Sequence, residues 1–127
     1  MIASIAAIAG GGALGAVLRH GANQGALHYF GPDYPYGTIS VNILGSFIMG
    51  LLISYFAHVW QPPPEVKAFL LTGLLGAFTT FSTFSLQFVL LWERGDMMAA
   101  LVYVLASVFF AIGALMLGMA IIRWIFL

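Results

Sequence analysis

Charged side chains are scarce in this chain of 127 residues. Four lysines and arginines and four aspartates and glutamates make up only 6% of the sequence, and the formal net charge is zero. Soluble domains carry about 25% charged residues, so this composition cannot cover a water-exposed surface. Without a basic cluster the chain also lacks the electrostatic footprint of a nucleic-acid-binding protein. We therefore expect most of its surface to face a lipid bilayer, in agreement with a mean hydropathy of +1.05.

Cysteine and the common catalytic motifs are absent as well. The lack of cysteine excludes a disulfide framework, a thiol nucleophile and a cysteine-ligated metal site. The sequence contains no nucleophile–base pair, phosphate-binding glycine loop or membrane metalloprotease motif. None of the long apolar stretches contains a carboxylate, the group that proton-coupled carriers usually titrate. These absences disfavour an enzyme and a proton-coupled carrier.

Four long apolar stretches alternate with joints rich in proline and glycine. A helix needs roughly 20 residues to cross the hydrocarbon core, and in lipid its backbone must be hydrogen-bonded internally. The sequence predicts an all-α membrane protein that forms one domain, residues 1–127. Its last helix is expected to be capped by Asp96. The four transmembrane helices are predicted at about residues 2–28, 37–58, 65–92 and 96–125.

The positive charges do not select an orientation in the membrane. With four spans, Lys67 and Arg123 fall on one side, and Arg19 and Arg94 fall on the other. The positive-inside rule therefore favours neither orientation. Two interpretations stay open: the small number of charges obscures a single orientation, or the protein inserts both ways and pairs as an antiparallel dimer.

Small residues mark the first two spans as sites of close helix packing. Gly11 and Gly15 form a small-xxx-small pair, which permits another helix to approach closely. In the second span, small and polar residues recur every fourth position, on one helix face that should meet protein or water. Asn42 differs from the others because it is the only carboxamide in this span, and its N–H donors could bind an anion. The residues at this spacing are Thr38, Asn42, Ser46, Gly50 and Ser54.

The centre of the third span is rich in glycine and hydroxyl groups. Gly73 and Gly76 precede five hydroxyl-bearing residues, and β-branched threonines disfavour a helix. We therefore expect a break between about Gly76 and Thr80. Free carbonyls at a break suit a small cation, and free N–H groups suit an anion. The alternative is a hydroxyl-rich packing seam. The hydroxyl-bearing residues are Thr79, Thr80, Ser82, Thr83 and Ser85.

Aromatic residues accompany these hydroxyls. Phe78, Phe81 and Phe84 repeat every third position, a spacing that by itself is typical of packing. The edge of a phenyl ring is partly positive, however, so rings turned edge-on could face an anion without trapping it. In the fourth span, Tyr103 and Ser107 lie one turn apart. They could extend a line of hydroxyl donors or bond backbone carbonyls.

Three segments resemble those of the Fluc (CrcB) fluoride channels. The resemblance implies a fluoride-selective channel for passive fluoride efflux across the bacterial plasma membrane. It also implies an antiparallel dual-topology homodimer with two pores, a third helix broken at mid-membrane and a central structural sodium ion. The length and the four-span layout match too, so the resemblance covers essentially the whole chain. The three segments are Gly11–Arg19, Tyr36–Gly45 and residues 73–85.

The resemblance assigns roles to individual residues. Gly76 and Thr79 match the positions whose backbone carbonyls hold sodium in the family. Phe81 and Phe84 match its paired pore-lining phenylalanines, and Asn42 matches its pore asparagine. These assignments predict a fluoride pore beside a sodium site.

A polar track continues this pore in the family. Two departures from the family pattern are Ala77, where relatives often have a second glycine, and Ala111, where some have another hydroxyl. The residues that match the track are Ser82, Thr83, Tyr103 and Ser107.

Two other functions compete with a fluoride channel. A small dual-topology, proton-coupled drug exporter shares the size, span count and undecided orientation, but its chemistry uses a glutamate that the first span lacks. A structural or accessory membrane subunit would need the third-span hydroxyls only for packing.

Overall fold

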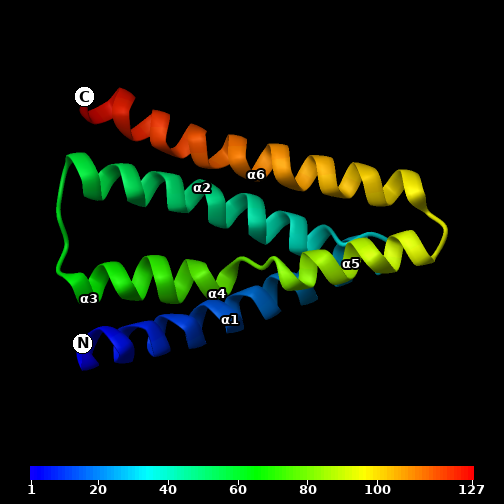
Figure 1. Ribbon diagram of the computed structural model, residues 1–127, viewed down its shortest axis with the longest axis horizontal. Coiled ribbons are helices and arrows are strands. Elements are labelled where there is room, and N and C mark those ends of the chain that lie inside the picture. The colour runs from blue at the N-terminus through cyan, green and yellow to red at the C-terminus, as the bar shows by residue number, and fades with distance from the viewer.

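The computed structural model describes residues 1–127, which form helices and no strand. Four helical segments are long and apolar enough to cross a membrane, as predicted, and their ends lie within two residues of the expected ones. Both termini lie at one end of the bundle together with the loop after α2, and the other two loops lie at the opposite end (Figure 1). The four segments are α1 (Ile2–Phe30), α2 (Tyr36–His58), the run Pro64–Glu93 and α6 (Met97–Phe126).

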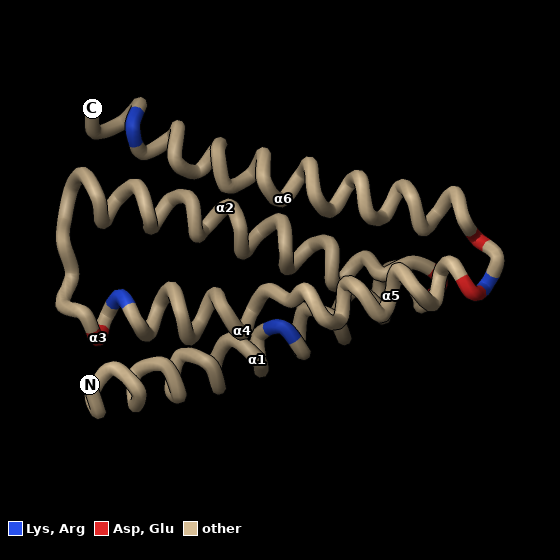
Figure 2. Tube along the Cα trace, in the orientation of Figure 1, with Lys and Arg blue, Asp and Glu red and all other residues tan.

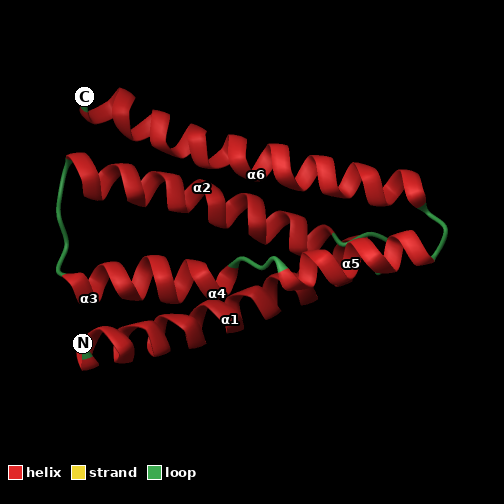
Figure 3. Cartoon of the chain, in the orientation of Figure 1, coloured by secondary structure: helices red, strands yellow, loops and turns green.

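The third segment is a composite of short helices. It begins with Pro64, whose missing N–H costs nothing in the first turn of a helix. Residues 79–81 belong to no helix, and Thr79 is extended with φ −87° and ψ 161°. Figure 3 shows this interruption as a loop inside the third segment. Its helical parts are α3 (Pro64–Lys67), the π-helix η1 (Ala68–Leu75), α4 (Gly76–Phe78) and α5 (Ser82–Glu93).

The segments pack in two tight pairs, α1 with η1 and α4, and α2 with α6. Gly11 and Gly15 are buried, and a Cβ at either position would collide with the backbone carbonyl of Phe69 or Leu74. The close approach predicted from this glycine pair is therefore confirmed. Gly50 lies against the backbone of α6 in the same way.

Charged residues lie at the two ends of the bundle, and large apolar side chains cover its sides (Figure 2). Such a surface suits lipid, which cannot solvate charge. Arg19 is the exception, because it lies part-way along α1 and makes no hydrogen bond or ion pair within the chain.

One ion pair lies at the end of the bundle that carries the first and third loops. Arg94 Nη2 lies 3.2 Å from Asp96 Oδ2 and donates a 3.0 Å hydrogen bond to the Asp33 carbonyl. Asp96 occupies the N-cap position of α6 as predicted, but its side chain pairs with Arg94 and does not cap the helix.

Candidate functional site

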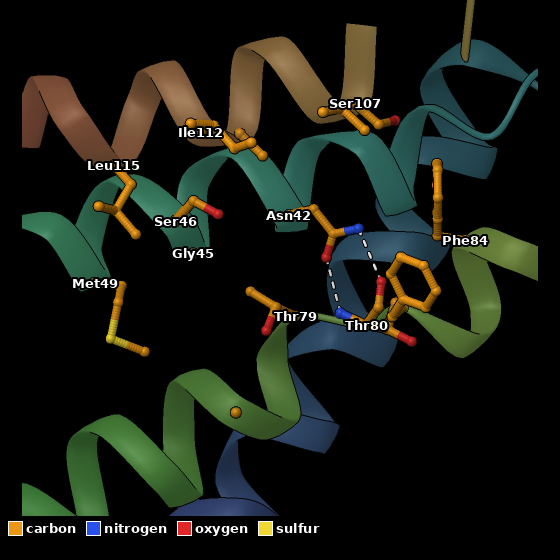
Figure 4. Close-up of a pocket in the computed structure, with 14 residues that line it drawn as sticks. Asn42, Gly45, Ser46, Met49, Thr79, Thr80, Phe84, Ser107, Ile112 and Leu115 are labelled. Carbon is orange, nitrogen blue, oxygen red and sulfur yellow. Dashed lines mark hydrogen bonds between the residues drawn. The ribbon is translucent and has the colours of Figure 1, made fainter. Parts of the chain in front are cut away.

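The break in the third segment is held by Asn42 of α2. The Asn42 Nδ2 group donates to the Thr80 carbonyl at 2.9 Å, and Asn42 Oδ1 accepts from the Thr80 amide at 2.8 Å (Figure 4). In a continuous α-helix the Thr80 amide would donate to the carbonyl four residues earlier. The Asn42 side chain thus replaces the helical partner of one peptide N–H and fixes the open turn. The second N–H of the Asn42 carboxamide makes no hydrogen bond.

Hydroxyl groups satisfy the backbone on both sides of the break. Thr79 Oγ1 donates to the Leu75 carbonyl at 2.9 Å, at the end of α4. Thr80 Oγ1 accepts from the Thr83 amide at 3.2 Å, in the first turn of α5. The threonines predicted to disfavour a helix therefore end one helix and begin the next.

Several backbone carbonyls at the break lack their helical partners. The Thr80 amide, the helical partner of the Gly76 carbonyl, bonds Asn42, and the Thr83 amide, the partner of the Thr79 carbonyl, bonds Thr80 Oγ1. The Gly76 and Thr79 carbonyls, predicted to hold a cation, thus both lack their helical bonds, and so does the Ala77 carbonyl, because the Phe81 amide donates no backbone hydrogen bond.

A cavity of about 520 Å³ lies between the break, α2 and α6. No charged side chain and no histidine lines it, so its polarity comes from amide, hydroxyl and peptide groups alone. A Cβ at Gly45 would collide with Thr79 Cγ2, so glycine is needed here for the break to approach α2. The predicted site residues in its lining are Asn42, Gly76, Thr79, Phe81, Phe84 and Ser107.

The two phenylalanines of the cavity lie in different surroundings. Their ring centroids are 5.5 Å apart. Phe84 is buried and packs 5.1 Å from the ring of Tyr103, whereas Phe81 is 77% exposed on the surface of the single chain. A ring so exposed cannot enclose a pore by itself, so this side of the cavity needs a cover.

The two hydroxyls of the fourth span are both buried. The Tyr103 hydroxyl donates to Gln87 Oε1 at 2.9 Å, and Ser107 Oγ has no hydrogen-bond partner. Neither bonds a backbone carbonyl, which was the alternative left open by the sequence. A buried hydroxyl without a partner is unfavourable, so Ser107 is a candidate donor to a ligand.

The structure brings together six of the nine predicted site residues around the cavity. Ser82 and Thr83 belong to the break but do not line the cavity, and Tyr103 lies behind Phe84. Gln87, the partner of Tyr103, was missed. It is the only carboxamide of the third span and lies one helical turn after Phe84, which is the signal that points to it.

Comparison with known proteins identifies the family. A sequence model described as CrcB-like protein, Camphor Resistance (CrcB), matches residues 6–119. The chain belongs to the CrcB-like family. The matched region contains every predicted site residue, from Asn42 to Ser107.

Relatives of this CrcB-like chain align over almost its whole length. A protein of Rhodospirillum centenum named fluoride-specific ion channel FluC is 53% identical over 119 residues, which are 94% of each chain. Proteins of the same name from Mesorhizobium japonicum and Cereibacter sphaeroides are 52% identical over 113 residues and 48% identical over 123 residues. These alignments cover 89% and 97% of this chain and 90% and 97% of the relatives. With its four spanning segments, the CrcB-like chain is a multi-pass membrane protein.

Proposed function

We propose that the protein is a fluoride-selective ion channel that lets fluoride leave the bacterial cytoplasm passively across the plasma membrane. The observation that carries the proposal is the cavity of neutral hydrogen-bond donors and aromatic rings at the middle of an interrupted span. The names of the relatives support it. A channel of this kind is not an enzyme, since no bond is made or broken in the ion.

Fluoride enters such a cavity by exchanging its water for protein donors. The unbonded N–H of Asn42 and the unpartnered hydroxyl of Ser107 supply hydrogen bonds, and the ring edges of Phe81 and Phe84 supply weaker attraction. Conduction requires that each site also release the ion. A lining without any cation meets this condition because it offers no strong ion pair.

The exposed side of the break supports an antiparallel homodimer with one pore in each subunit. Gly76, Phe81 and Ser82 are exposed on a bundle whose sides are covered mainly by large apolar side chains. Lipid cannot satisfy the peptide groups and hydroxyls of a break, so a protein surface must cover them. A second copy supplies that cover, and the small difference in positive charge between the two ends allows the copies to insert in opposite orientations.

The freed carbonyls of Gly76 and Thr79 fit the structural sodium ion implied by the family resemblance. Oxygen donors suit a hard cation, and both carbonyls have lost their helical partners. A sodium ion bound by these carbonyls in both copies would balance their partial negative charge and join the two breaks.

Fluoride efflux from liposomes that contain only the purified protein tests the proposed function. We expect a fluoride electrode to record efflux for the parent chain and at least a tenfold slower rate for Phe81→Ile, because the branched side chain removes the ring. Phe110→Ile is the matched control: Phe110 is exposed on α6 and does not line the cavity, and its variant should keep the parent rate.

Two results would overturn this assignment. Proton-linked drug uptake by the same liposomes would indicate the exporter, and the absence of any transport would indicate a structural subunit. If Phe81→Ile keeps the parent efflux rate, the Phe81 ring does not contribute to the pore.

A further inference from the structure

A second cavity of about 240 Å³ lies where the first loop meets the start of α2. Its polar lining comes from three parts of the chain, with Asn23 from α1, Tyr34 and Thr38 from the loop and α2, and Gln87 from α5. Neither the break nor the first cavity involves Tyr34.

The two cavities lie next to each other along three helices. On α2, Thr38 lies one turn before Asn42, and on α6, Tyr103 lies one turn before Ser107. On α5, Gln87 follows Phe84 by three residues and accepts the Tyr103 hydrogen bond. Residues at these spacings share a helix face. Thus α2 and α5 each present one residue to the first cavity and the next to the second, and the buried Tyr103 of α6 packs against a lining residue of each cavity, Phe84 and Tyr34.

The second cavity also contains unused hydrogen-bonding groups. Thr38 is 1% exposed, and its hydroxyl has no hydrogen-bond partner although the Tyr103 hydroxyl is its neighbour. The Tyr103 hydroxyl donates to the Oε1 atom of Gln87. The N–H groups of the Gln87 carboxamide make no hydrogen bond within the chain. A buried, unpartnered hydroxyl at a cavity is best explained by a ligand or water that bonds it.

The first loop holds Tyr34 against this cavity by its own local structure. Gly31 ends α1 with a positive φ of 81°, and Pro35 forms an inverse γ-turn with φ −80° and ψ 64°. This turn is closed by the Tyr36 amide, which donates to the Tyr34 carbonyl at 2.8 Å. The Tyr34 ring packs edge-on against Tyr103 with centroids 5.7 Å apart.

Tyr34 stays uncharged at this position. Burial, and secondly the nearby Tyr36, raises the pKa of Tyr34 above its ordinary value, so its hydroxyl is neutral at physiological pH. An anion in the cavity therefore meets no phenolate.

Arg94 fixes the same loop from the opposite side. It donates to the Asp33 carbonyl, next to Tyr34, while its pairing with Asp96 anchors it at the start of α6. Arg94 is the only lysine or arginine at this end of the bundle, where the carboxylates are those of Asp33, Glu93 and Asp96.

We propose that the second cavity is a mouth of the pore that binds a small, hydrogen-bond-accepting anion at Thr38 and Gln87, and that Tyr34, positioned by Arg94, is the wall that covers Thr38. This inference rests on the proposed function, because fluoride is the anion that has to pass. Tyr34 and Arg94 act here as positioning residues that set the width of the mouth.

The absence of native cysteine allows a direct test by thiol labelling. In the Thr38→Cys variant, reconstituted in liposomes, the only thiol lies in the second cavity. The rate of its reaction with a water-soluble methanethiosulfonate is measured alone and with added sodium fluoride or sodium chloride. Tyr34→Ala removes the wall, and its matched control Tyr34→Phe keeps the ring.

We expect Tyr34→Ala to speed labelling at least tenfold over Tyr34→Phe. Arg94→Gln should speed labelling at least threefold, whereas Glu93→Gln, which changes an adjacent charge without any bond to the loop, should not. Fluoride should slow labelling at least twofold more than the same concentration of chloride.

Equal labelling rates with alanine and phenylalanine at position 34 would overturn the proposal that the Tyr34 ring covers Thr38. Equal effects of the two salts would overturn the anion site at the mouth. Fluoride efflux by the parent chain, recorded separately, keeps the two proposals apart: normal efflux with unresponsive labelling contradicts only this inference, and absent efflux contradicts the proposed function.

Discussion

A carboxamide carries a donor and an acceptor side by side and can therefore bond both groups of a peptide strand. Asn42 does this for Thr80, which lies 38 residues away in the sequence. The residue type suggested a ligand for an anion, and no local pattern could indicate that both hydrogen bonds of the Asn42 side chain go to the protein backbone. Asn42 is thus both a candidate pore residue and the anchor of the break, which makes it a poor probe of either role alone.

A substitution at Ser107 separates an effect on function from an effect on folding better than one at Asn42. Its hydroxyl has no partner within the chain, so Ser107→Ala should leave the free energy of unfolding unchanged or raise it slightly, by less than about 1 kcal/mol. If the hydroxyl binds fluoride, efflux should fall at least fivefold. Efflux from liposomes and thermal unfolding in detergent measure the two effects.

Ser54→Ala is the matched control for this serine. Ser54 is buried on α2 away from the cavity, and its hydroxyl donates to the Met119 carbonyl at 3.4 Å. The substitution should lower stability by about 0.5–1.5 kcal/mol and leave efflux unchanged. A Ser107 variant that behaved in the same way would lose its place in the pore.

At the scale of elements, the geometry of the break in the third segment depends on how closely α2 approaches it. Gly45 leaves the space that the Thr79 methyl group fills, opposite the point where the chain becomes extended. Two devices thus shape the break from outside, a missing side chain at Gly45 and a bonding one at Asn42. Both belong to α2, so the geometry of the break is set by a neighbouring helix.

Gly45→Ala should disturb this arrangement. The added methyl group would collide with Thr79, so we expect a loss of about 1–3 kcal/mol in stability and a lower fluoride efflux. Gly113→Ala is the control, because nothing lies within 4 Å of its Cβ position, and alanine at this site in α6 should stabilise the helix by up to about 1 kcal/mol. An unfolding curve for each variant, recorded beside its efflux rate, checks both. Equal shifts in the two variants would contradict the contact.

Much of the element scale could be predicted from the sequence. Apolar length predicted the four segments, and glycine with threonine predicted irregular backbone between about Gly76 and Thr80, where the structure has a last helical turn and then an extended residue. The π-helix η1 could not be predicted, because its apolar residues differ in no local preference from those of an α-helix. The second cavity was also missed, since Thr38 and Gln87 meet only through tertiary packing.

At the scale of the whole molecule, the small number of positive charges leaves orientation to very small differences. Lys67 and Arg123 lie at the end of the bundle with the termini, Arg94 lies at the other end, and Arg19 lies inside α1. An antiparallel pair needs both orientations in similar amounts. The proposed dimer therefore makes charge balance a condition for assembly.

A change of charge at one end should upset this balance. A cysteine placed at Leu127 reports orientation, because that residue is exposed and the chain has no other thiol. We expect an impermeant thiol reagent to label about half of the parent protein in intact cells. Adding Glu65→Lys should draw the end with the termini to the cytoplasm, reduce labelling several-fold and lower fluoride efflux, since few antiparallel pairs can form. Labelling of all or none of the parent protein would exclude dual topology.

The bonds between Asn42 and Thr80 also order events during biosynthesis. Asn42 lies in the second segment and Thr80 lies in the third, so the ribosome synthesises the carboxamide before the peptide groups that it bonds. The third segment can first enter the bilayer as a plain apolar helix and open only when the second segment is beside it. The Thr80 amide and carbonyl, which lipid would leave without partners, are thereby bonded within the chain before a second copy covers the rest of the break.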